Sequence, residues 1–214
     1  FKDKLVGSSY AVETEDGLYV HGGWTYEGVS NLSYKIVFSQ NLALPDITLL
    51  SPDYNFPVPR LKFSAVIFAG KIYIFGGQSH SGTLLNDLWA YDIEKENWTL
   101  LPNNGVKPPA LKEYSMSVYG YDIFISGGET EEGLNVNSYG YSTLTTMWYD
   151  ATEYTIGIVF RRSSCIAQSG LNIYLYGGRD DAGYSNKLYK FDIVMQSFIQ
   201  IYASGDVPPP LSGA

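Results

Sequence analysis

Hydrophobic and polar positions alternate in short runs along the chain, and the clearest run begins at Lys71. Lys71–Phe75 (KIYIF) alternates aromatic and β-branched residues with others, which is typical of a strand. Gly76-Gly77 ends this predicted strand, and a polar loop follows. A second strand is predicted at Leu88–Asp92. After the charged turn Ile93–Asn97, a third strand is expected to open on Trp98.

This unit recurs four times along the chain. Glycine pairs stand 54, 51 and 50 residues apart, each after an aromatic-rich strand, at Gly22-Gly23, Gly76-Gly77, Gly127-Gly128 and Gly177-Gly178. A further glycine follows five residues after each pair, at Gly28, Gly82, Gly133 and Gly183, and an asparagine comes soon after, at Asn31, Asn86, Asn137 and Asn186. Aromatic residues seven positions apart also repeat, as Tyr91/Trp98, Tyr141/Trp148 and Phe191/Phe198, and are expected to fill the seam between stacked sheets. A period of about 50 residues with four short strands per unit indicates a β-propeller.

The remaining strands and the blade boundaries follow from the same alignment. Inner strands are predicted at Tyr10–Thr14, Ser64–Phe68, Ser115–Tyr119 and Ser164–Gln168, and the outer strands of the first unit near Tyr34–Phe38 and Ile47–Leu50. Proline-rich crossings at Ser51–Pro59 and Asn103–Ala110 should be loops, because proline removes a ladder donor. The predicted domain is one propeller over 1–214, with blades at about 1–59, 60–110, 111–155 and 156–207. Residues 208–214 would start a further blade.

These repeats resemble kelch repeats, in which a strand, a glycine pair, a loop and a spaced tyrosine and tryptophan recur. The resemblance covers nearly the whole chain and places it with the galactose oxidase-like propellers. It implies an all-β fold with four recognisable blades of four-stranded antiparallel sheet. Kelch rings usually have five to seven blades, so an incomplete arc of a larger ring is expected, with a closed four-bladed ring as the alternative. The first unit departs from the pattern, with Ile36 at the tyrosine position and no tryptophan in Gln40–Pro45. Because of that departure, the repeat pattern does not decide whether the outer strands of the first unit form.

Composition narrows the classes of partner. The 214-residue chain has a formal net charge of −8 and 19 tyrosines, and only 17% of its residues are charged. An acidic surface argues against nucleic acid and anionic membrane as partners. No apolar run has the length of about 18 residues that a membrane span needs. The single cysteine, Cys165, excludes an internal disulfide, and its place at the start of an inner strand predicts a small buried residue, with a reactive thiol as the alternative.

Candidate catalytic chemistry is sparse. Only His21 and His80 supply imidazoles, His21 occupies a repeat position filled by Phe75, Ser126 and Tyr176 elsewhere, and no zinc- or iron-binding spacing occurs. The resemblance raises a copper oxidase like galactose oxidase, which needs two His, two Tyr and a Cys–Tyr crosslink, but every candidate here is explained by its repeat position. The iron motif of kelch-type specifier proteins is absent. Glu131/Glu132 and Asp180/Asp181 could form a glycosidase pair, although both sit on loops. We therefore predict no catalytic residue, no metal and no cofactor.

The loops after the glycine pairs are the predicted binding surface, because loops on a rigid scaffold commonly carry function. They are rich in residues that give contact area or charge, and the candidates are Trp24, Tyr26, Glu27, His80, Glu129, Glu131, Glu132, Arg179, Asp180, Asp181 and Tyr184. The sequence predicts a non-catalytic protein-interaction scaffold or adaptor whose partner has a basic surface. The alternatives are a secretory-pathway propeller that binds carbohydrate or acts as an oxidase, and a structural part of an assembly. Two Asn-x-Ser/Thr sites, at Asn31 and Asn97, leave the compartment open.

Overall fold

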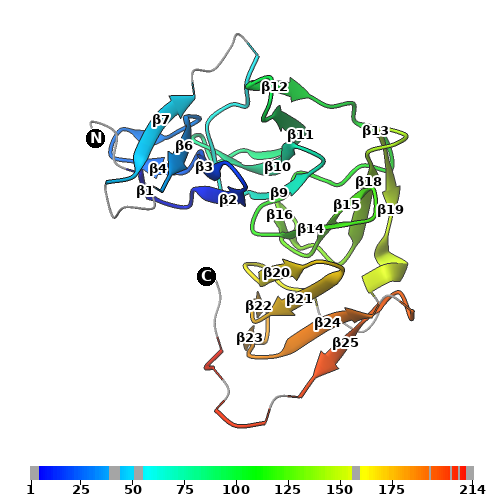
Figure 1. The fold of residues 1–214 in the computed structure, drawn as a ribbon. Coiled ribbons are helices and arrows are strands. Elements are labelled where there is room, and N and C mark those ends of the chain that lie inside the picture. Colours follow the sequence, from blue (N-terminus) through cyan, green and yellow to red (C-terminus); the bar gives the residue numbers. More distant parts are fainter. Residues whose placement is uncertain are drawn as a thin grey trace. The chain divides into compact units, whose positions relative to one another are not determined.

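A computed structural model of the chain describes residues 5–38, 44–50, 55–155, 160–192, 194–202, 204–206 and 208–210. The chain divides into two compact units, Phe1–Leu101 and Pro102–Ala214. Almost every element is a β-strand (Figure 1), apart from the short 3₁₀ helix η1 (Thr152–Thr155). Among the described residues, no helix is long and apolar enough to cross a membrane. Most of the segment 40–45 and the last four residues, on which two predictions depended, lie outside the described residues.

The unit Phe1–Leu101 contains two larger antiparallel sheets and a small one, in which β4 (Trp24–Thr25) pairs with β1 (Leu5–Gly7) and β5 (Gly28–Val29). The first sheet has the order β2 (Tyr10–Thr14), β3 (Gly17–His21), β6 (Ser33–Val37) and β7 (Asp46–Leu50). The second sheet has the order β9 (Ser64–Phe68), β10 (Lys71–Ser79), β11 (Leu84–Asp92) and β12 (Asn97–Leu100), with β8 (Arg60–Leu61) paired to the far end of β10. Both outer strands of the first sheet therefore form despite the missing tyrosine and tryptophan. The prediction that Gly76-Gly77 ends its strand was wrong, because β10 continues through the pair with a register shift between Phe75 and Gly77.

The unit Pro102–Ala214 repeats this arrangement. Its third sheet has the order β14 (Ser115–Tyr119), β15 (Asp122–Ser126), β18 (Ser138–Ser142) and β19 (Met147–Asp150), and its fourth has β20 (Cys165–Ser169), β21 (Asn172–Tyr176), β24 (Leu188–Asp192) and β25 (Ser197–Ile201). Four four-stranded antiparallel sheets confirm the four predicted blades.

One core prediction in the fourth sheet was wrong. Cys165 opens β20, within one residue of the predicted start of that strand, but its side chain is exposed. The whole of β20 is exposed apart from the half-buried Ile166, whereas β14, which is also an edge strand, is largely buried; the described residues cover β14 but not β20.

Aromatic side chains fill the space between neighbouring sheets. Tyr91 and Trp98 lie directly opposite each other on β11 and β12, with ring centroids 5.2 Å apart, and Tyr91 also meets Tyr19 of the first sheet at 6.0 Å. Phe191 plays the same part in the other unit, 5.3 Å from its cross-strand partner Phe198 and 5.7 Å from a ring of the third sheet. Such tilted aromatic pairs add stability beyond the area that they bury. The seven-residue spacing in the sequence therefore encodes a pair that joins two strands and two sheets.

Trp148 has a further partner that the sequence analysis missed. Its ring lies 5.0 Å from that of Tyr141, opposite it on β18, and the two side chains are nearly completely buried. The indole N–H of Trp148 also donates to the side-chain oxygen of Asn103 at 3.1 Å, and its backbone carbonyl accepts from the Val106 N–H at 2.9 Å. A buried indole needs such an acceptor. The spacing predicted Trp148 only as a ring between sheets, whereas the structure shows that it also holds the crossing that precedes the third sheet.

The crossing Asn103–Ala110 is consequently not all loop, and that prediction was wrong. It includes the two-residue strand β13 (Asn104–Gly105), which pairs in parallel with β19 so that Gly105 lies opposite Trp148. A Cβ at Gly105 would clash with the Trp148 carbonyl oxygen. The prolines of the crossing stand after this strand, so they remove no donor from it. The third sheet therefore has a fifth strand at its outer edge.

Two of the glycine pairs, Gly22-Gly23 and Gly127-Gly128, form a backbone joint between consecutive sheets. The N–H of Gly23 donates to the carbonyl of Arg60 at 3.0 Å, and the N–H of Gly128 donates to the carbonyl of Arg161, also at 3.0 Å. Both arginines belong to the segment that leads into the following sheet. A Cβ at Gly22 would lie 2.8 Å from the Arg60 carbonyl oxygen, so a larger residue cannot be accommodated without movement. The glycine pair is therefore needed both for its left-handed backbone and for the close approach of the next segment.

Arg60 also anchors this joint with its side chain. It is fully buried, and its guanidinium donates to both carboxylate oxygens of Asp87 at 2.9 and 2.8 Å and to the carbonyl of Gly76 at 2.8 Å. Asp87 in turn accepts a hydrogen bond from the indole of Trp89 at 2.6 Å. The buried positive charge of Arg60 is thus paired with a carboxylate and hydrogen-bonded, as buried charges must be.

Gly127→Ala tests the joint with a matched control at Gly120. Both glycines have φ near 65° (68° and 63°), but a Cβ at Gly127 would clash with the Arg161 carbonyl oxygen, whereas one at Gly120 meets nothing within 4 Å. We expect Gly120→Ala to lower the free energy of unfolding by about 1–2 kcal/mol through backbone strain alone. Gly127→Ala should cost about 2 kcal/mol more, because the clash adds to the strain. Urea unfolding of the two variants measures the difference, and equal losses would contradict the joint.

His21 makes stability depend on pH. It is buried, its Nδ1 lies 2.8 Å from the Ser33 hydroxyl, and burial, helped by the charge of Arg60, lowers its pKa to about 3. The unfolded chain therefore takes up a proton below a pH of about 6.5 that the folded chain refuses, so stability falls as the pH drops.

Between pH 7 and pH 5 this group alone should remove about 2 kcal/mol of unfolding free energy. His21→Phe, which copies Phe75 of the second sheet, should abolish that part of the pH dependence whatever its effect at pH 7. Denaturant unfolding at both pH values provides the measurement. An unchanged difference between the two pH values in the variant would show that another group is responsible.

Candidate functional site

Short hairpins follow the glycine pairs, and one side chain fixes each turn. In the hairpin of β4 (Trp24–Thr25) and β5 (Gly28–Val29), the Thr25 hydroxyl donates to the Gly28 carbonyl at 2.9 Å and accepts from the Glu27 N–H at 3.2 Å. Thr130 makes both bonds, each at 3.1 Å, between β16 (Glu129–Thr130) and β17 (Gly133–Leu134). In the hairpin of β22 (Arg179–Asp180) and β23 (Gly183–Tyr184), the Asp180 carboxylate accepts from the Ala182 N–H at 2.9 Å. Such side chain–backbone bonds hold the two tip residues outward.

A second anchor closes three of these hairpins onto their glycine pairs. The backbone N–H groups of Ser30, Asn135 and Ser185 donate to the carbonyl of the second glycine at 2.8, 2.9 and 2.9 Å. Asn135 is buried, and its side-chain amide donates to the carbonyls of Gly127 and Asn137 at 2.8 Å each. The repeat spacing had pointed to asparagines one or two positions further along and to neither of these anchors. The signals were present as Thr-x-x-Gly or Asp-x-x-Gly, and as a polar residue seven positions after the pair.

In the unit Phe1–Leu101, the structure brings Trp24 and His80 together. Their rings stack with centroids 6.2 Å apart and planes 24° apart, and Trp24 remains 45% exposed. The His80 ring also lies against the hairpin, where its Nδ1 accepts a long bond of 3.5 Å from the Val29 N–H. Tyr26 and Glu27 occupy the hairpin tip, and Tyr26 is 79% exposed. The four predicted residues of this unit therefore form an exposed aromatic surface with one carboxylate.

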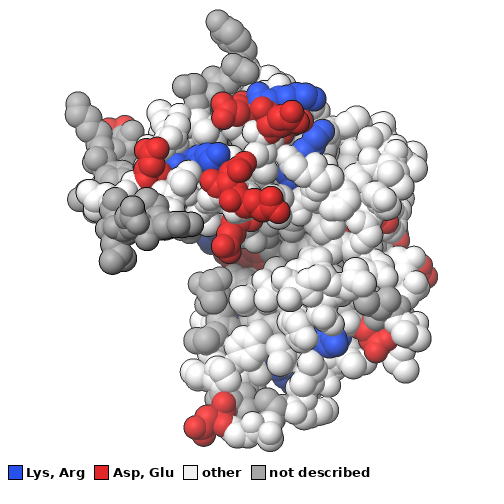
Figure 2. Space-filling model, in the orientation of Figure 1, with Lys and Arg blue, Asp and Glu red and all other residues white. Residues whose placement is uncertain are grey.

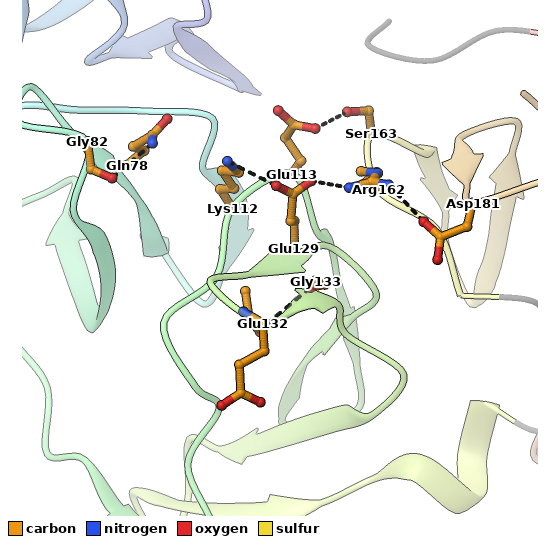
Figure 3. A network of polar contacts seen from close by, with 11 residues as sticks. Gln78, Gly82, Lys112, Glu113, Glu129, Glu132, Gly133, Arg162, Ser163 and Asp181 are labelled. Atoms are coloured by element: carbon orange, nitrogen blue, oxygen red, sulfur yellow. Dashed lines mark hydrogen bonds and ion pairs between the residues drawn. The ribbon is translucent and has the colours of Figure 1, made fainter. Parts of the chain in front are cut away.

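In the unit Pro102–Ala214, Figure 3 shows a chain of ion pairs that links the third and fourth sheets. Glu129 lies between Lys112, at 3.2 Å, and Arg162, with which it forms a short ion pair. Arg162 also donates to Asp181 at 3.1 Å. The hydrogen bond from Arg162, assisted by Lys112, holds the pKa of the Glu129 carboxyl below its usual range, and the same bond raises the pKa of Arg162.

Asp180 and Arg179 are the remaining charged candidates in the hairpin of the fourth sheet. Asp180 Oδ2 lies 3.4 Å from Nε of the buried Arg161, an ion pair that lacks hydrogen-bond geometry. Arg179 is exposed and lies over the Tyr184 ring, 5.6 Å from its centroid. Glu129, Asp180 and Asp181 therefore all face arginine or lysine, and the pair of Glu129 with Arg162 joins the third sheet's loop to the segment that enters the fourth sheet.

Glu131 and Glu132 differ from these three acids. They occupy the exposed tip of β16–β17, and no described residue forms an ion pair or hydrogen bond with either carboxylate. Figure 3 shows the Glu132 side chain pointing away from the ion-pair network. Both residues line a groove of about 500 Å³ between their hairpin and the crossing at Pro109 and Ala110. On the face drawn in Figure 2, acidic side chains gather in patches among mostly uncharged surface.

Residues 8–214 match the family of the KLHDC2/KLHL20/DRC7 Kelch-repeats domain. The chain belongs to the kelch-repeat family. This kelch domain is similar to the Acyl-CoA-binding domain-containing protein 6 of Oryza sativa subsp. japonica, with 25% identity over 82% of the chain and 29% of that protein. It is also similar to Tip elongation aberrant protein 3 of Schizosaccharomyces pombe, with 25% identity over 89% of the chain and 20% of that protein.

A third relative is an N-(sulfonatooxy)prop-2-enimidothioate sulfolyase of Thlaspi arvense, 24% identical over 63% of the chain and 40% of that protein. The kelch domain thus spans less than half of each of these relatives. Among solved structures, "Structure of YjhT" superposes with a TM-score of 0.74 at 16% identity, over 96% of this chain and 68% of that one. This likeness confirms the propeller fold.

The kelch domain keeps its two imidazoles in different surroundings. His21 is packed inside, 4.9 Å from the ring of Trp98, and His80 lies at the surface with Trp24. Among the residues that the structure describes, no three His, Cys, Asp or Glu side chains gather as a metal-ion site would require.

Arg162→Leu should raise the pKa of the Glu129 carboxyl towards its usual range, because the hydrogen bond from Arg162 is the main cause that lowers it. A lowered carboxyl pKa stabilises the fold above its ordinary value and loses that effect as the pH falls through the folded value. The variant should therefore be less stable near neutral pH, and the gap should narrow in acid. Carbon-detected NMR titration of Glu129 provides the measurement. Arg179→Leu, which removes an exposed arginine outside this network, should leave the Glu129 titration unchanged. Equal effects of the two variants would contradict the assignment.

Proposed function

We propose that this kelch domain is a non-catalytic protein-interaction module that binds its partners through the hairpins after the glycine pairs. The observation that carries the proposal is the contrast between the anchors and the tips of these hairpins. Thr25 and Thr130 fix the turns from inside, whereas Tyr26, Glu131 and Glu132 project into solvent. Binding residues on fixed loops lose little conformational freedom when a partner arrives.

The exposed aromatic residues support a protein partner. Tyr26 and Tyr184 are 79% and 59% exposed, and Trp24 is 45% exposed. Tyrosine and tryptophan supply large contact areas at a low entropic cost, and arginine beside them, as at Arg179, adds directional hydrogen bonds. The net charge of −8 favours a partner whose contacting surface is basic.

The state of the acidic groups supports a non-catalytic role. A glycosidase acid needs a carboxyl whose pKa is raised, so that it can donate a proton. Asp180 and Asp181, one of the two candidate pairs, each face an arginine, and ion pairing lowers the pKa of the neighbouring Glu129, which is the opposite tuning. Burial keeps His21 neutral and away from solvent. The relatives carry names as different as a sulfolyase and a leucine-zipper-like transcriptional regulator, in keeping with the rule that function lies in sites grafted on a fold.

The test starts with affinity purification of partners of the full-length protein, followed by hydrogen exchange of the purified complex. We expect a protein partner to protect residues 24–30, 78–84, 129–137 and 179–186. Tyr26→Ser combined with Tyr184→Ser should weaken that complex at least about tenfold, since each removes an exposed aromatic contact. Tyr202→Ser is the control, because Tyr202 is 84% exposed and lies outside these hairpins. Protection confined to other segments, or an equal loss with Tyr202→Ser, would overturn the proposal.

A further inference from the structure

The groove beside the third sheet is built from three separate stretches of chain. They are the crossing at Pro109 and Ala110, the hairpin tip with Glu131 and Glu132, and the segment at Val136 and Asn137. Its volume of about 500 Å³ is of the size that holds one or two side chains of a bound peptide. All of these residues belong to the unit Pro102–Ala214.

The groove has one sign of charge. Glu131 and Glu132 line it together with neutral residues, and no lysine or arginine lines it. The nearby cations Lys112 and Arg162 are engaged by Glu129, on the other side of β16 in Figure 3. Neither carboxylate forms an ion pair with a described residue. A concave surface with a single sign of charge concentrates ligands of the opposite charge.

The rest of the lining suits the aliphatic part of a long cationic side chain. Pro109, Leu134 and Val136 present apolar surface, and Val136 is 57% exposed. The buried ring of Tyr139 also lines the groove. Lysine and arginine place their methylene stems along apolar surface while the charged end finds a polar partner. The groove thus offers both halves of the contact that such a side chain makes.

The groove is held in shape before any partner binds. The Thr130 hydroxyl fixes the turn that carries Glu131 and Glu132. The Asn135 amide ties the facing segment to the carbonyls of Gly127 and Asn137. A site that is already ordered loses less entropy on binding than one that must be assembled.

We infer that this groove binds an extended segment of a partner protein, with a lysine or arginine side chain between Pro109 and the carboxylates of Glu131 and Glu132. The inference rests on the proposed function and names the partner chemistry at one of its loops. An acidic segment or a nucleic acid backbone is repelled by the same two carboxylates. The crossing at Pro109 and the strip at Val136 and Asn137 have no regular secondary structure, and all three residues are exposed.

The probe is a pool of nine-residue peptides with arginine fixed at the centre and uncharged residues elsewhere, compared with pools that carry citrulline or glutamate there. Binding is measured by fluorescence anisotropy at two salt concentrations and by NMR shifts of Val136 and Asn137. We expect the arginine pool to bind the kelch domain at the groove and the citrulline pool to bind at least about tenfold more weakly, because citrulline has no charge. Added salt should weaken the binding of the arginine pool.

The protein variants separate charge from structure. Glu131→Gln with Glu132→Gln should lower the affinity for the arginine pool about tenfold, and Glu131→Lys with Glu132→Lys should abolish binding. The matched control is Glu94→Lys with Glu96→Lys, which reverses two exposed acids in the turn between β11 and β12 and should leave the affinity unchanged. Thermal unfolding should be unaltered by both Gln substitutions, since neither carboxylate has a partner among the described residues.

Two results would overturn the inference. One is equal binding of the arginine and citrulline pools. The other is an affinity for the arginine pool that is the same for the unchanged domain, the Gln double variant and the Lys double variant, including the case in which none of them binds. If the natural partner still protects the hairpins from exchange in that case, the interaction function stands and only the partner chemistry is wrong. If the arginine pool occupies the groove but no partner protects the hairpins, the inference holds while the wider proposal fails.

Discussion

One backbone contact underlies the arrangement of this protein: a glycine N–H meets the carbonyl of the segment that enters the next sheet. Gly23 reaches Arg60 and Gly128 reaches Arg161 in the same way, and both pairs open the same pattern, Gly-Gly-x-Thr-x-Glu-Gly. The contact needs the chain at the glycine pair to be left-handed and also bare of a Cβ. Because both sheets meet at this point, the aromatic residues on their faces, such as Tyr91 and Tyr19, come within packing distance. The contact at the glycine pair therefore sets how closely neighbouring sheets pack.

The same contact explains why charge has two different uses in the loops. Near the joint, charged groups are surrounded by protein and have to be paired, as Arg60 is with Asp87 and Arg162 is with Glu129. Two or three residues further along, the hairpin tips face solvent, and Glu131 and Glu132 keep their charges unpaired by any described residue. Charges of the same kind in one short loop therefore divide into those that are paired near the joint between sheets and those that are exposed to solvent.

Much of the fold was accessible from the sequence, because its signals are repeated. The glycine pairs, the aromatic pairs and the strand β9 (Ser64–Phe68) lie where the spacing predicted them. The features that were missed depend on single contacts between distant residues. Nothing in the local pattern around Glu129 indicates that Arg162, 33 positions later, would neutralise it. Trp148 likewise bonds to a side chain 45 positions earlier, and the repeat spacing carries no trace of that contact.

Burial at the edge of a sheet was also beyond the reach of the repeat. Cys165 was expected to be buried because its repeat position is inner, but its exposure depends on what covers one particular edge strand. The repeat describes what the sheets have in common, and an edge strand is where one sheet differs from the others.

The threonine turns have a consequence for how such a protein can change. Thr25 and Thr130 hold their hairpins with the same two hydrogen bonds, although the residues that they present are Tyr26-Glu27 in one case and Glu131-Glu132 in the other. The bonds involve backbone atoms of the tip residues and leave their side chains free. The two residues at a hairpin tip can therefore be replaced by another pair while the backbone conformation of the hairpin stays the same. Substitutions at these two positions can therefore change the surface that a hairpin presents while its backbone hydrogen bonds are kept.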